Sequence, residues 1–193
     1  MPKLILASTS KYRQQQLKQI NVAFQAVAPL IDEEALKKTA PVSKTDLPLF
    51  LAQKKAESLI AQFPQSTIIG SDQMGFLGSK PLGKAGTKEK AIQQLLDLQG
   101  KTHQLHTAVA VYSQGQWLQH VDITELTMKP LTEKQIRHYV DLENPIDCAG
   151  SYKFEALGIT LFEHVQTKDP SSITGLPLMT VALFLNRLGL SPI

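Results

Sequence analysis

Short apolar runs and helically spaced apolar residues alternate along the chain, and this pattern predicts its strands and helices. Apolar runs that are too short for a helix and are bounded by polar turns predict buried strands, here at residues 3–7, 22–27, 66–73 and 158–162. Apolar residues that recur at helical spacing predict helices, here at residues 12–20, 46–63, 87–98, 132–142 and 178–188. Two longer strands, residues 102–113 and 116–128, flank Gln114-Gly115 and predict a hairpin.

Strands that alternate with helices early in the chain and pair as a hairpin later predict a mixed α/β sheet, not a purely parallel one. The 193 residues suffice for one sizeable hydrophobic core. No internal repeat, low-complexity tract or linker interrupts the chain, so we expect a single domain over residues 1–193.

Composition and charge narrow the classes of function. The chain is 42% hydrophobic and 19% charged, which is ordinary for a soluble globular protein. Its net charge of +3 comes without a basic run, so we expect no nucleic-acid interface. Cys148 is the single cysteine, which indicates a reducing compartment. Neither a membrane-spanning apolar run nor a signal peptide is recognisable, and we therefore expect a cytoplasmic protein without membrane partners.

The turn after the first predicted strand carries three hydroxyls, Ser8, Thr9 and Ser10, and Arg13 follows within the next helical turn. Free backbone N–H groups at a helix start, hydroxyl donors and a planar guanidinium all suit phosphate oxygens. The alternative is a serine N-cap beside an exposed arginine, which is a common local structure. The residue types of this stretch therefore fit both an anion site and a capped helix start, and the local pattern does not decide between them.

Carboxylates and lysines occur at further ends of apolar elements. Asp72 ends an apolar strand, where it could bind a metal, deprotonate a water, or bond its own backbone in a turn. The acidic residues 32–34 either supply a second carboxylate to a divalent-metal site or form a solvated surface. Lys55, on the long helix, and Lys84, in a Gly-flanked loop at residues 80–86, could neutralise a triphosphate, although single lysines usually lie on surfaces.

Seven motifs occur in order along essentially the whole chain: LILASTSKYRQQQL, IDEE, LAQKKA, IIGSDQ, LGK, CAGSYKFEALGITLFE and DPSSITGLPL. Together they resemble the Maf family of nucleotide pyrophosphatases. The most specific are S-T-S-x-x-R, G-S-D-Q and G-S-Y-K-F-E. They resemble the branch that acts on 7-methyl-GTP (the YceF type) more than the branch that acts on dTTP and UTP.

The resemblance implies a fold, an activity and partners. The fold would be two-lobed α/β with a central cleft, related to the inosine triphosphate pyrophosphatases. The activity would be hydrolysis of a nucleoside triphosphate to the monophosphate and pyrophosphate, with a divalent metal cation, Mg²⁺ or Mn²⁺. A homodimer is also expected from the resemblance.

The resemblance assigns roles to single residues as well. Asp72 matches the family's proton acceptor, and Glu33 matches an acidic position that would hold the metal together with Asp72. The phosphate-binding positions are matched by Ser8, Arg13, Lys55 and Lys84, with Ser10 in the same hydroxyl turn. The positions that divide the family by base preference are matched by Tyr12, Gln73 and Glu155. Tyr12 stands where the 7-methyl-GTP branch often carries tryptophan.

Base preference also has a physical argument. Methylation at N7 gives guanine a positive charge that an aromatic face such as Tyr12 attracts. A carboxylate such as Glu155 can accept two hydrogen bonds from the ring N–H and amino group of the purine. We therefore expect hydrolysis of 7-methyl-GTP by water attack on the α-phosphorus. The alternatives are a Maf-type enzyme for dTTP, UTP or another noncanonical nucleotide, a non-catalytic nucleotide-binding regulator of cell division, and a plain binding module.

Overall fold

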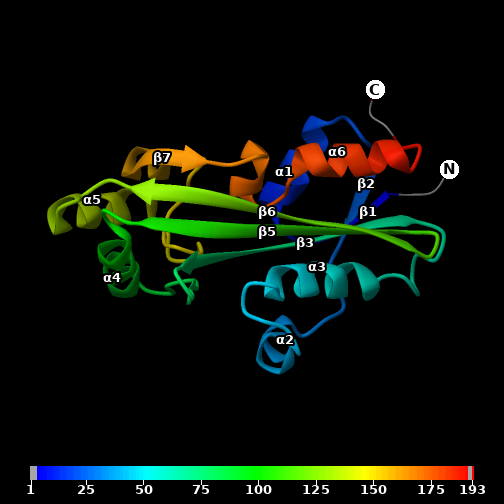
Figure 1. Cartoon of the computed structure of the whole chain (residues 1–193), viewed down its shortest axis with the longest axis horizontal. Coiled ribbons are helices and arrows are strands. Elements are labelled where there is room, and N and C mark those ends of the chain that lie inside the picture. The colour runs from blue at the N-terminus through cyan, green and yellow to red at the C-terminus, as the bar shows by residue number, and fades with distance from the viewer. Residues whose placement is uncertain (1–3, 191–192) are drawn as a thin grey trace. The chain divides into compact units, whose positions relative to one another are not determined.

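The computed structural model describes residues 4–190 and 193, and its β-strands form one mixed sheet (Figure 1). Seven strands are present in the described residues, in the order β2-β1-β3-β5-β6-β7, with β4 paired to β3. Their bounds are β1 Leu4–Ala7, β2 Phe24–Val27, β3 Thr67–Leu77, β4 Lys80–Leu82, β5 Thr102–Ser113, β6 Gln116–Met128 and β7 Phe162–Gln166. The mixed α/β prediction is confirmed, and residue 3 of the first predicted strand lies outside the described residues.

Six α-helices and two short 3₁₀ helices, η1 and η2, occupy the same described part of the chain. Their bounds are α1 Lys11–Gln19, α2 Glu33–Thr39, α3 Leu47–Glu57, α4 Lys88–Leu98, α5 Glu133–Glu143, η1 Leu157–Leu161, η2 Pro170–Thr174 and α6 Leu178–Arg187. Thr87 caps α4, and Thr132 caps α5 in a reciprocal capping box. Across the described residues, no helix has the length and apolar character that crossing a membrane requires.

The predicted hairpin is confirmed in its strands and in its turn. β5 and β6 are neighbours in the sheet and have the predicted bounds. Gln114 and Gly115, between them, have φ values of 48° and 83°. Positive φ at both central residues is the geometry of a type I′ turn, which matches the twist of the flanking strands.

The chain divides into two compact units. Unit 1 comprises residues 4–73, 107–122 and 169–190, and unit 2 comprises residues 74–106 and 123–168. The strands β3, β5 and β6 are therefore each divided between the two units, with one stretch in each.

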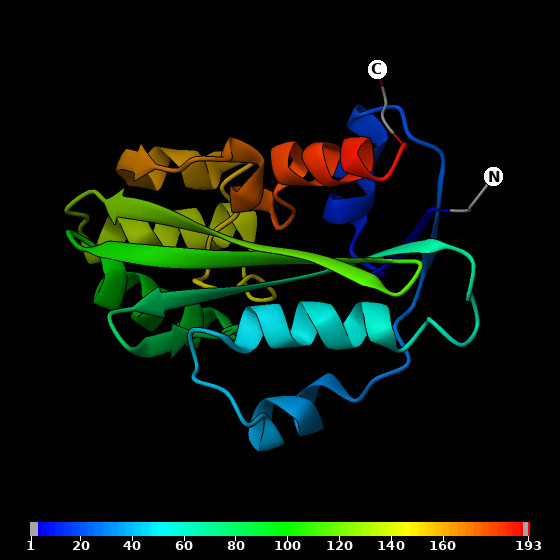
Figure 2. The same cartoon turned by 45° about the vertical axis from the view of Figure 1, so that its right-hand side comes forward.

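In unit 1, both faces of the sheet are covered by helices. Figures 1 and 2 show α3 on one face and α1 and α6 on the other. Leu4 and Leu6 of β1 belong to the core cluster that includes α1 and α6, whereas Ile5 and Ala7 belong to the cluster that includes α3. Because alternate residues of a strand point to opposite faces, a strand covered on both sides must be apolar throughout, as LILA is.

Unit 2 has its own helical layer and an aromatic cluster. α4 packs against α5, and both bury one apolar face. The rings of His103, Tyr152 and Phe162 lie within 5.8 Å of one another, and His103 Nε2 is 2.8 Å from the Tyr152 hydroxyl. His103 Nδ1 is buried and has no hydrogen-bond partner among the described residues.

Three predicted elements differ from the structure. The helix predicted over residues 46–63 ends at Glu57, because Ser58 Oγ donates to Lys55 O at 2.8 Å and the amides of residues 59 and 60 bond three residues back. The strand predicted at residues 158–162 is wrong. That stretch begins as η1, in which short-range hydrogen bonds replace a strand partner, and β7 follows it.

The third difference concerns the strand predicted over residues 66–73. It continues to Leu77, because the last three residues of β3 pair antiparallel with β4. Two expectations are therefore corrected. Asp72 does not end its strand, and the predicted loop at residues 80–86 contains β4.

His103 makes the stability of the fold dependent on pH. It is 1% exposed, and burial lowers its pKa to about 4. Between about pH 6.5 and pH 4, the unfolded chain therefore binds a proton that the folded chain does not bind. As the pH falls through this range, the free energy of unfolding decreases by about 3 kcal/mol. His103→Gln, whose amide can reach the Nε2 position without titrating, should remove this part of the pH dependence. Urea unfolding of both proteins at pH 7 and pH 4 measures the difference, and equal slopes with pH would contradict the assignment.

Candidate active site

Three parallel strands bring polar residues to one edge of the sheet in unit 1. β1 lies between β2 and β3 and pairs with both in parallel, so the carboxyl ends of all three strands point the same way. Ser8 follows β1 directly, and Glu33 begins the helix that comes after β2. Asp72 lies past Ile69, the last residue of β3 that pairs with β1. Open α/β sheets place their ligands at this edge.

A glycine allows α3 to lie unusually close to β3. A Cβ atom at Gly70 would lie 2.0 Å from Ala52 O and 2.9 Å from Ala56 N, so no other residue fits there without moving backbone. Asp72 is two residues further along the strand and therefore points to the same face as Gly70. Lys55 lies between Ala52 and Ala56, on the stretch of α3 that approaches Gly70. This close approach places the Lys55 side chain beside Asp72.

Lys55, Asp72 and Glu33 form a linked set of charges. Lys55 Nζ lies 2.5 Å from Asp72 Oδ1 and 2.8 Å from Glu33 Oε2. Lys55 is 6% exposed and Asp72 is 5% exposed. Charges that are this deeply buried need partners, because an unpaired one would be strongly destabilising. The surface interpretation of Lys55 is therefore wrong.

The acidic residues 32–34 have three different roles. Asp32 Oδ1 accepts the Ala35 N–H at 3.0 Å and caps α2, a helix that the apolar pattern does not predict. Glu34 is exposed and pairs with Lys37. Glu33 alone reaches Lys55, while its second oxygen lies 3.0 Å from Lys37 Nζ. One of the three carboxylates thus joins the site, and the other two are structural or solvated.

The two carboxylates titrate in opposite directions. Burial raises the pKa of Asp72 above its ordinary value, although the charges of Lys55 and Arg13 oppose this shift. Burial also acts to raise the pKa of Glu33, but Lys55 and Lys37 outweigh it and bring that pKa down to about 2. A carboxylate with a raised pKa is the stronger base of the two, so Asp72 is the better proton acceptor.

The hydroxyl turn holds the start of α1. Ser8 Oγ accepts the Ser10 N–H at 3.1 Å, and Ser10 Oγ accepts the Arg13 N–H at 3.4 Å as the N-cap of α1. Arg13 is half-buried, and Nε donates to Gly175 O at 2.8 Å. Desolvation lowers the pKa of Arg13, while the charges of Asp72 and Glu33 raise it. The serine N-cap is thus real, but the arginine beside it is directed into the site.

The backbone carbonyls of residues 171–176 orient several polar side chains, which the sequence patterns did not reveal. The side chains from outside this segment that are seen to donate to these carbonyls are Arg13, Gln16, Ser71, Gln73 and Thr107. Gln73 Nε2 lies 2.8 Å from Ser172 O and 2.8 Å from Thr107 Oγ1. The Gln73 amide and the Arg13 guanidinium thus donate to carbonyls of the same segment, residues 171–176.

Asp169 holds residues 171–176 in place. It is 3% exposed, and its carboxylate accepts the backbone N–H and hydroxyl of Ser171 and the backbone N–H of Met179 at 2.9 Å. These contacts join η2 to the start of α6. An Asp-Pro-Ser sequence is typical of a capped helix start, and this signal in DPSSITGLPL could have located Asp169.

Lys84 and Glu155 belong to unit 2, where both are exposed. Lys84 forms an antiparallel bridge with Ala149, so its loop lies against the CAGSYKFE segment. Burial raises the pKa of Cys148. The negative charge of Glu155 also raises this pKa, and the positive charge of Lys84 lowers it. Both side chains therefore lie near Cys148, which is half-buried.

The donor set for a metal consists of two carboxylates. The described part of the chain contains no group of three or more His, Cys, Asp and Glu side chains that could hold an ion. Glu33 and Asp72 share Lys55 Nζ and so present oxygens toward one point. Mg²⁺ is usually held by one or two carboxylates together with substrate phosphates, and this donor set fits such an ion.

Comparison with known proteins identifies the family. A model described as Maf-like protein matches residues 3–188. The chain belongs to the Maf family. A 7-methyl-GTP pyrophosphatase of Bdellovibrio bacteriovorus is 46% identical over 187 residues, which cover 97% of both chains. Those of Xanthomonas axonopodis pv. citri and Saccharophagus degradans are both 41% identical, over 98% of this chain and 98% and 96% of theirs.

In this Maf-family chain, unit 1 contains eight of the ten sequence-predicted site residues, which are Ser8, Ser10, Tyr12, Arg13, Glu33, Lys55, Asp72 and Gln73. Ion pairs join Lys55 to Glu33 and to Asp72, and the charge of Arg13 acts on Asp72. Tyr12, on α1, is 46% exposed.

Gly70→Ala tests whether the close approach of α3 forms the site. Its Cβ would meet backbone atoms that cannot rotate away, so we expect a loss of about 1–3 kcal/mol in the free energy of unfolding and a matching loss of turnover. Gly83→Ala is the control, because a Cβ there meets nothing within 4 Å. Chemical denaturation measures both variants. Equal stability of the two would show that α3 adjusts freely and that Gly70 does not set the distance.

Proposed function

We propose that this chain hydrolyses 7-methyl-GTP to 7-methyl-GMP and pyrophosphate. The names of relatives that are 40–46% identical over nearly the whole chain support the substrate and the class of reaction. The structural observation that carries the proposal is the buried carboxylate of Asp72, bonded to Lys55 and within the electrostatic influence of Arg13 and Glu33. Such a set can hold a polyphosphate and activate a water in one place.

Asp72 acts as the proton acceptor in this proposal. Its pKa is raised by burial, so it takes a proton more readily than an exposed aspartate does. The water that loses this proton attacks the α-phosphorus, and the bond from that phosphorus to the bridging oxygen of pyrophosphate breaks. Lys55 stabilises the ionised form of Asp72 in the nucleotide-free protein.

Basic and hydroxyl groups hold the triphosphate. Arg13 uses Nε for Gly175 O, so we assign the terminal amino groups of its guanidinium to phosphate oxygens. Ser8 and Ser10 contribute hydroxyl donors from the start of α1, where the helix dipole also favours an anion. Lys84 keeps the phosphate-binding role that the family resemblance implies.

Glu33 and Asp72 would hold a divalent cation, Mg²⁺ or Mn²⁺, together with phosphate oxygens. When bound, such an ion supplies neutralisation of phosphate charge and polarisation of the phosphorus–oxygen bonds. The low pKa of Glu33, about 2, keeps this carboxylate ionised and able to serve as a ligand at all physiological pH values.

The family resemblance assigns base preference to Tyr12 and Glu155. Tyr12 is 46% exposed at the start of α1 and presents a ring that a cationic purine can approach. Glu155 is exposed and has a carboxylate that can accept two purine hydrogen bonds. Gln73 keeps the base-preference role that the family resemblance implies, and its amide donates to the carbonyls of residues 172 and 173. The homodimer and the cytoplasmic location remain predictions of the sequence, and the sedimentation coefficient of the purified protein tests the first.

Asp72→Asn tests the proton acceptor. The amide keeps the size and polarity of the side chain but cannot take a proton, so kcat should fall by about 10²–10⁴-fold. Asp32→Asn is the matched control and should leave kcat unchanged, because asparagine caps a helix as well as aspartate does. Pyrophosphate release at saturating substrate measures both. Near wild-type turnover of the Asp72 variant would remove Asp72 from this role.

A substrate panel with Glu155→Ala tests the proposed function. We expect the wild type to prefer 7-methyl-GTP over GTP, UTP and dTTP. Loss of a charged acceptor should lower kcat/KM for 7-methyl-GTP by about 10–100-fold while UTP hydrolysis changes little. Glu163→Ala, an exposed glutamate of the same unit, is the control.

Other results of the panel would contradict parts of this assignment. Preference for UTP or dTTP would favour the other Maf branch. Nucleotide binding without pyrophosphate release would favour the regulator, and equal losses on purine and pyrimidine substrates would place Glu155 at the phosphates.

A further inference from the structure

Lys55 Nζ occupies the point at which the two proposed metal ligands converge. It is 2.5 Å from Asp72 Oδ1 and 2.8 Å from Glu33 Oε2. Its side chain is 7% exposed, so this ammonium group is a buried charge and not a solvated surface charge. The other oxygen of Glu33 is bonded to Lys37. Three carboxylate oxygens that a divalent ion could use, Asp72 Oδ1 and both oxygens of Glu33, therefore already have cationic partners.

The charges at this point are balanced without an added ion. Glu33, Glu34 and Asp72 contribute three negative charges, and Lys55, Lys37 and Arg13 contribute three positive charges. A divalent ion within bonding distance of both carboxylates would lie close to the Lys55 ammonium group, and two cations at such a separation in a buried site repel each other strongly. A triphosphate changes this balance, because it brings several negative charges and acceptor oxygens for an ammonium group.

We propose that Lys55 acts as a resident counter-cation, which excludes divalent ions from Glu33 and Asp72 until a triphosphate draws its ammonium group away. This inference rests on the proposed function, because it takes the metal ligands and the triphosphate from it. Lysine suits the role, since it is a point charge on a flexible stem that can exchange one set of oxygens for another. Metal and nucleotide then bind cooperatively, and each raises the affinity for the other by the same factor.

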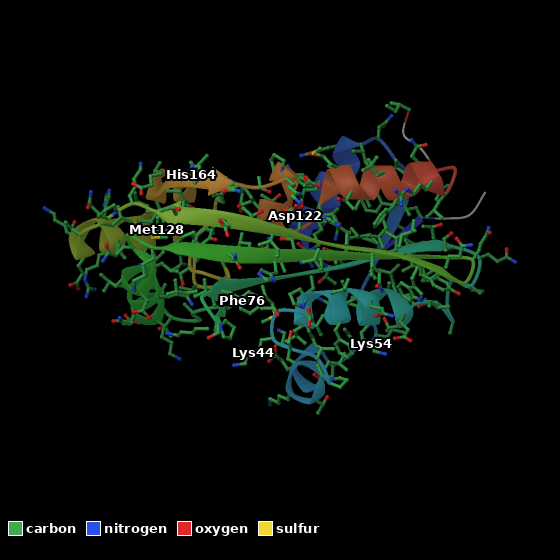
Figure 3. The ribbon with its side chains drawn as sticks, viewed as in Figure 1. Lys44, Lys54, Phe76, Asp122, Met128 and His164 are labelled. Carbon is green, nitrogen blue, oxygen red and sulfur yellow. The ribbon has the colours of Figure 1, made fainter. Side chains whose placement is uncertain are left out.

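The chain offers a matched control on the same helix. Lys54 precedes Lys55 on α3 (labelled in Figure 3), and its side chain is 38% exposed and pairs with Glu57 at 2.6 Å. A change at Lys54 alters the charge of the protein by the same amount without touching Glu33 or Asp72.

The test measures Mn²⁺ binding to the nucleotide-free protein by electron paramagnetic resonance. Lys55→Gln removes the charge and keeps a hydrogen-bond donor for the buried carboxylates, and Lys55→Met is a second variant without the donor. We expect both to bind Mn²⁺ at least tenfold more tightly than the wild type, whereas Lys54→Gln binds it as the wild type does. Adding Glu33→Gln to Lys55→Gln should abolish the gain, which locates the ion at this site.

Nucleotide coupling gives a second readout. The α,β-methylene analogue of 7-methyl-GTP, which cannot be cleaved at the reacting bond, should strengthen Mn²⁺ binding to the wild type far more than to Lys55→Gln. If folded Lys55→Gln binds Mn²⁺ no more tightly than the wild type, the inference is overturned. Circular dichroism verifies the fold of each variant, and Lys55→Gln decides the question if the methionine variant does not fold.

Hydrolysis by the wild type separates this inference from the proposed function. A wild type that releases pyrophosphate from 7-methyl-GTP, combined with unchanged Mn²⁺ affinity in Lys55→Gln, overturns the inference alone. A wild type that hydrolyses no nucleotide, combined with the tenfold gain in Lys55→Gln, overturns the proposed function and supports the exclusion of metal by Lys55.

Discussion

A buried pair of opposite charges, Lys55 and Asp72, constrains much of unit 1. Neither side chain could be buried alone, because desolvation of an unpaired charge costs far more than a typical protein can tolerate. The two must therefore meet at hydrogen-bond distance, as they do at 2.5 Å. That requirement fixes how close α3 lies to β3, and it explains why Gly70 faces the backbone of Ala52 where any Cβ would collide. Stability and chemistry depend here on the same contact.

The same constraint extends to the opposite side of the strand. Ser71, which alternates with Asp72 along β3, donates to Ala108 O and Gly175 O at 2.8 and 2.9 Å. Gly175 O also accepts from Arg13, so one carbonyl ties the guanidinium to the strand that carries the proton acceptor. Because Asp169 fixes residues 171–176 in turn, the position of Arg13 depends on a chain segment more than 150 residues away.

Local chemistry could be predicted from the sequence, whereas contacts made by distant partners could not. The Gln114-Gly115 turn depends on two adjacent residues, and its prediction is confirmed. The Thr132 cap of α5 is a contact of the same local kind. The role of Glu33 within IDEE depends on Lys55, which lies on another helix, and no local pattern distinguishes it from its neighbours. Residues 171–176 act through backbone carbonyls, so side-chain identity reveals little of their function. The family motifs assigned roles to single residues, which residue spacing alone could not do.

The hydroxyl turn shows why structural and functional interpretations of one motif need not exclude each other. Ser10 caps α1 by accepting the Arg13 N–H, and Ser8 accepts the Ser10 N–H. Both contacts use a hydroxyl oxygen as an acceptor, which leaves each hydroxyl proton as a donor. A phosphate oxygen needs donors, so capping orients the hydroxyls without consuming the group that would bind the ligand. The helix start is thereby rigid before a substrate arrives, and its dipole and Arg13 act in the same direction.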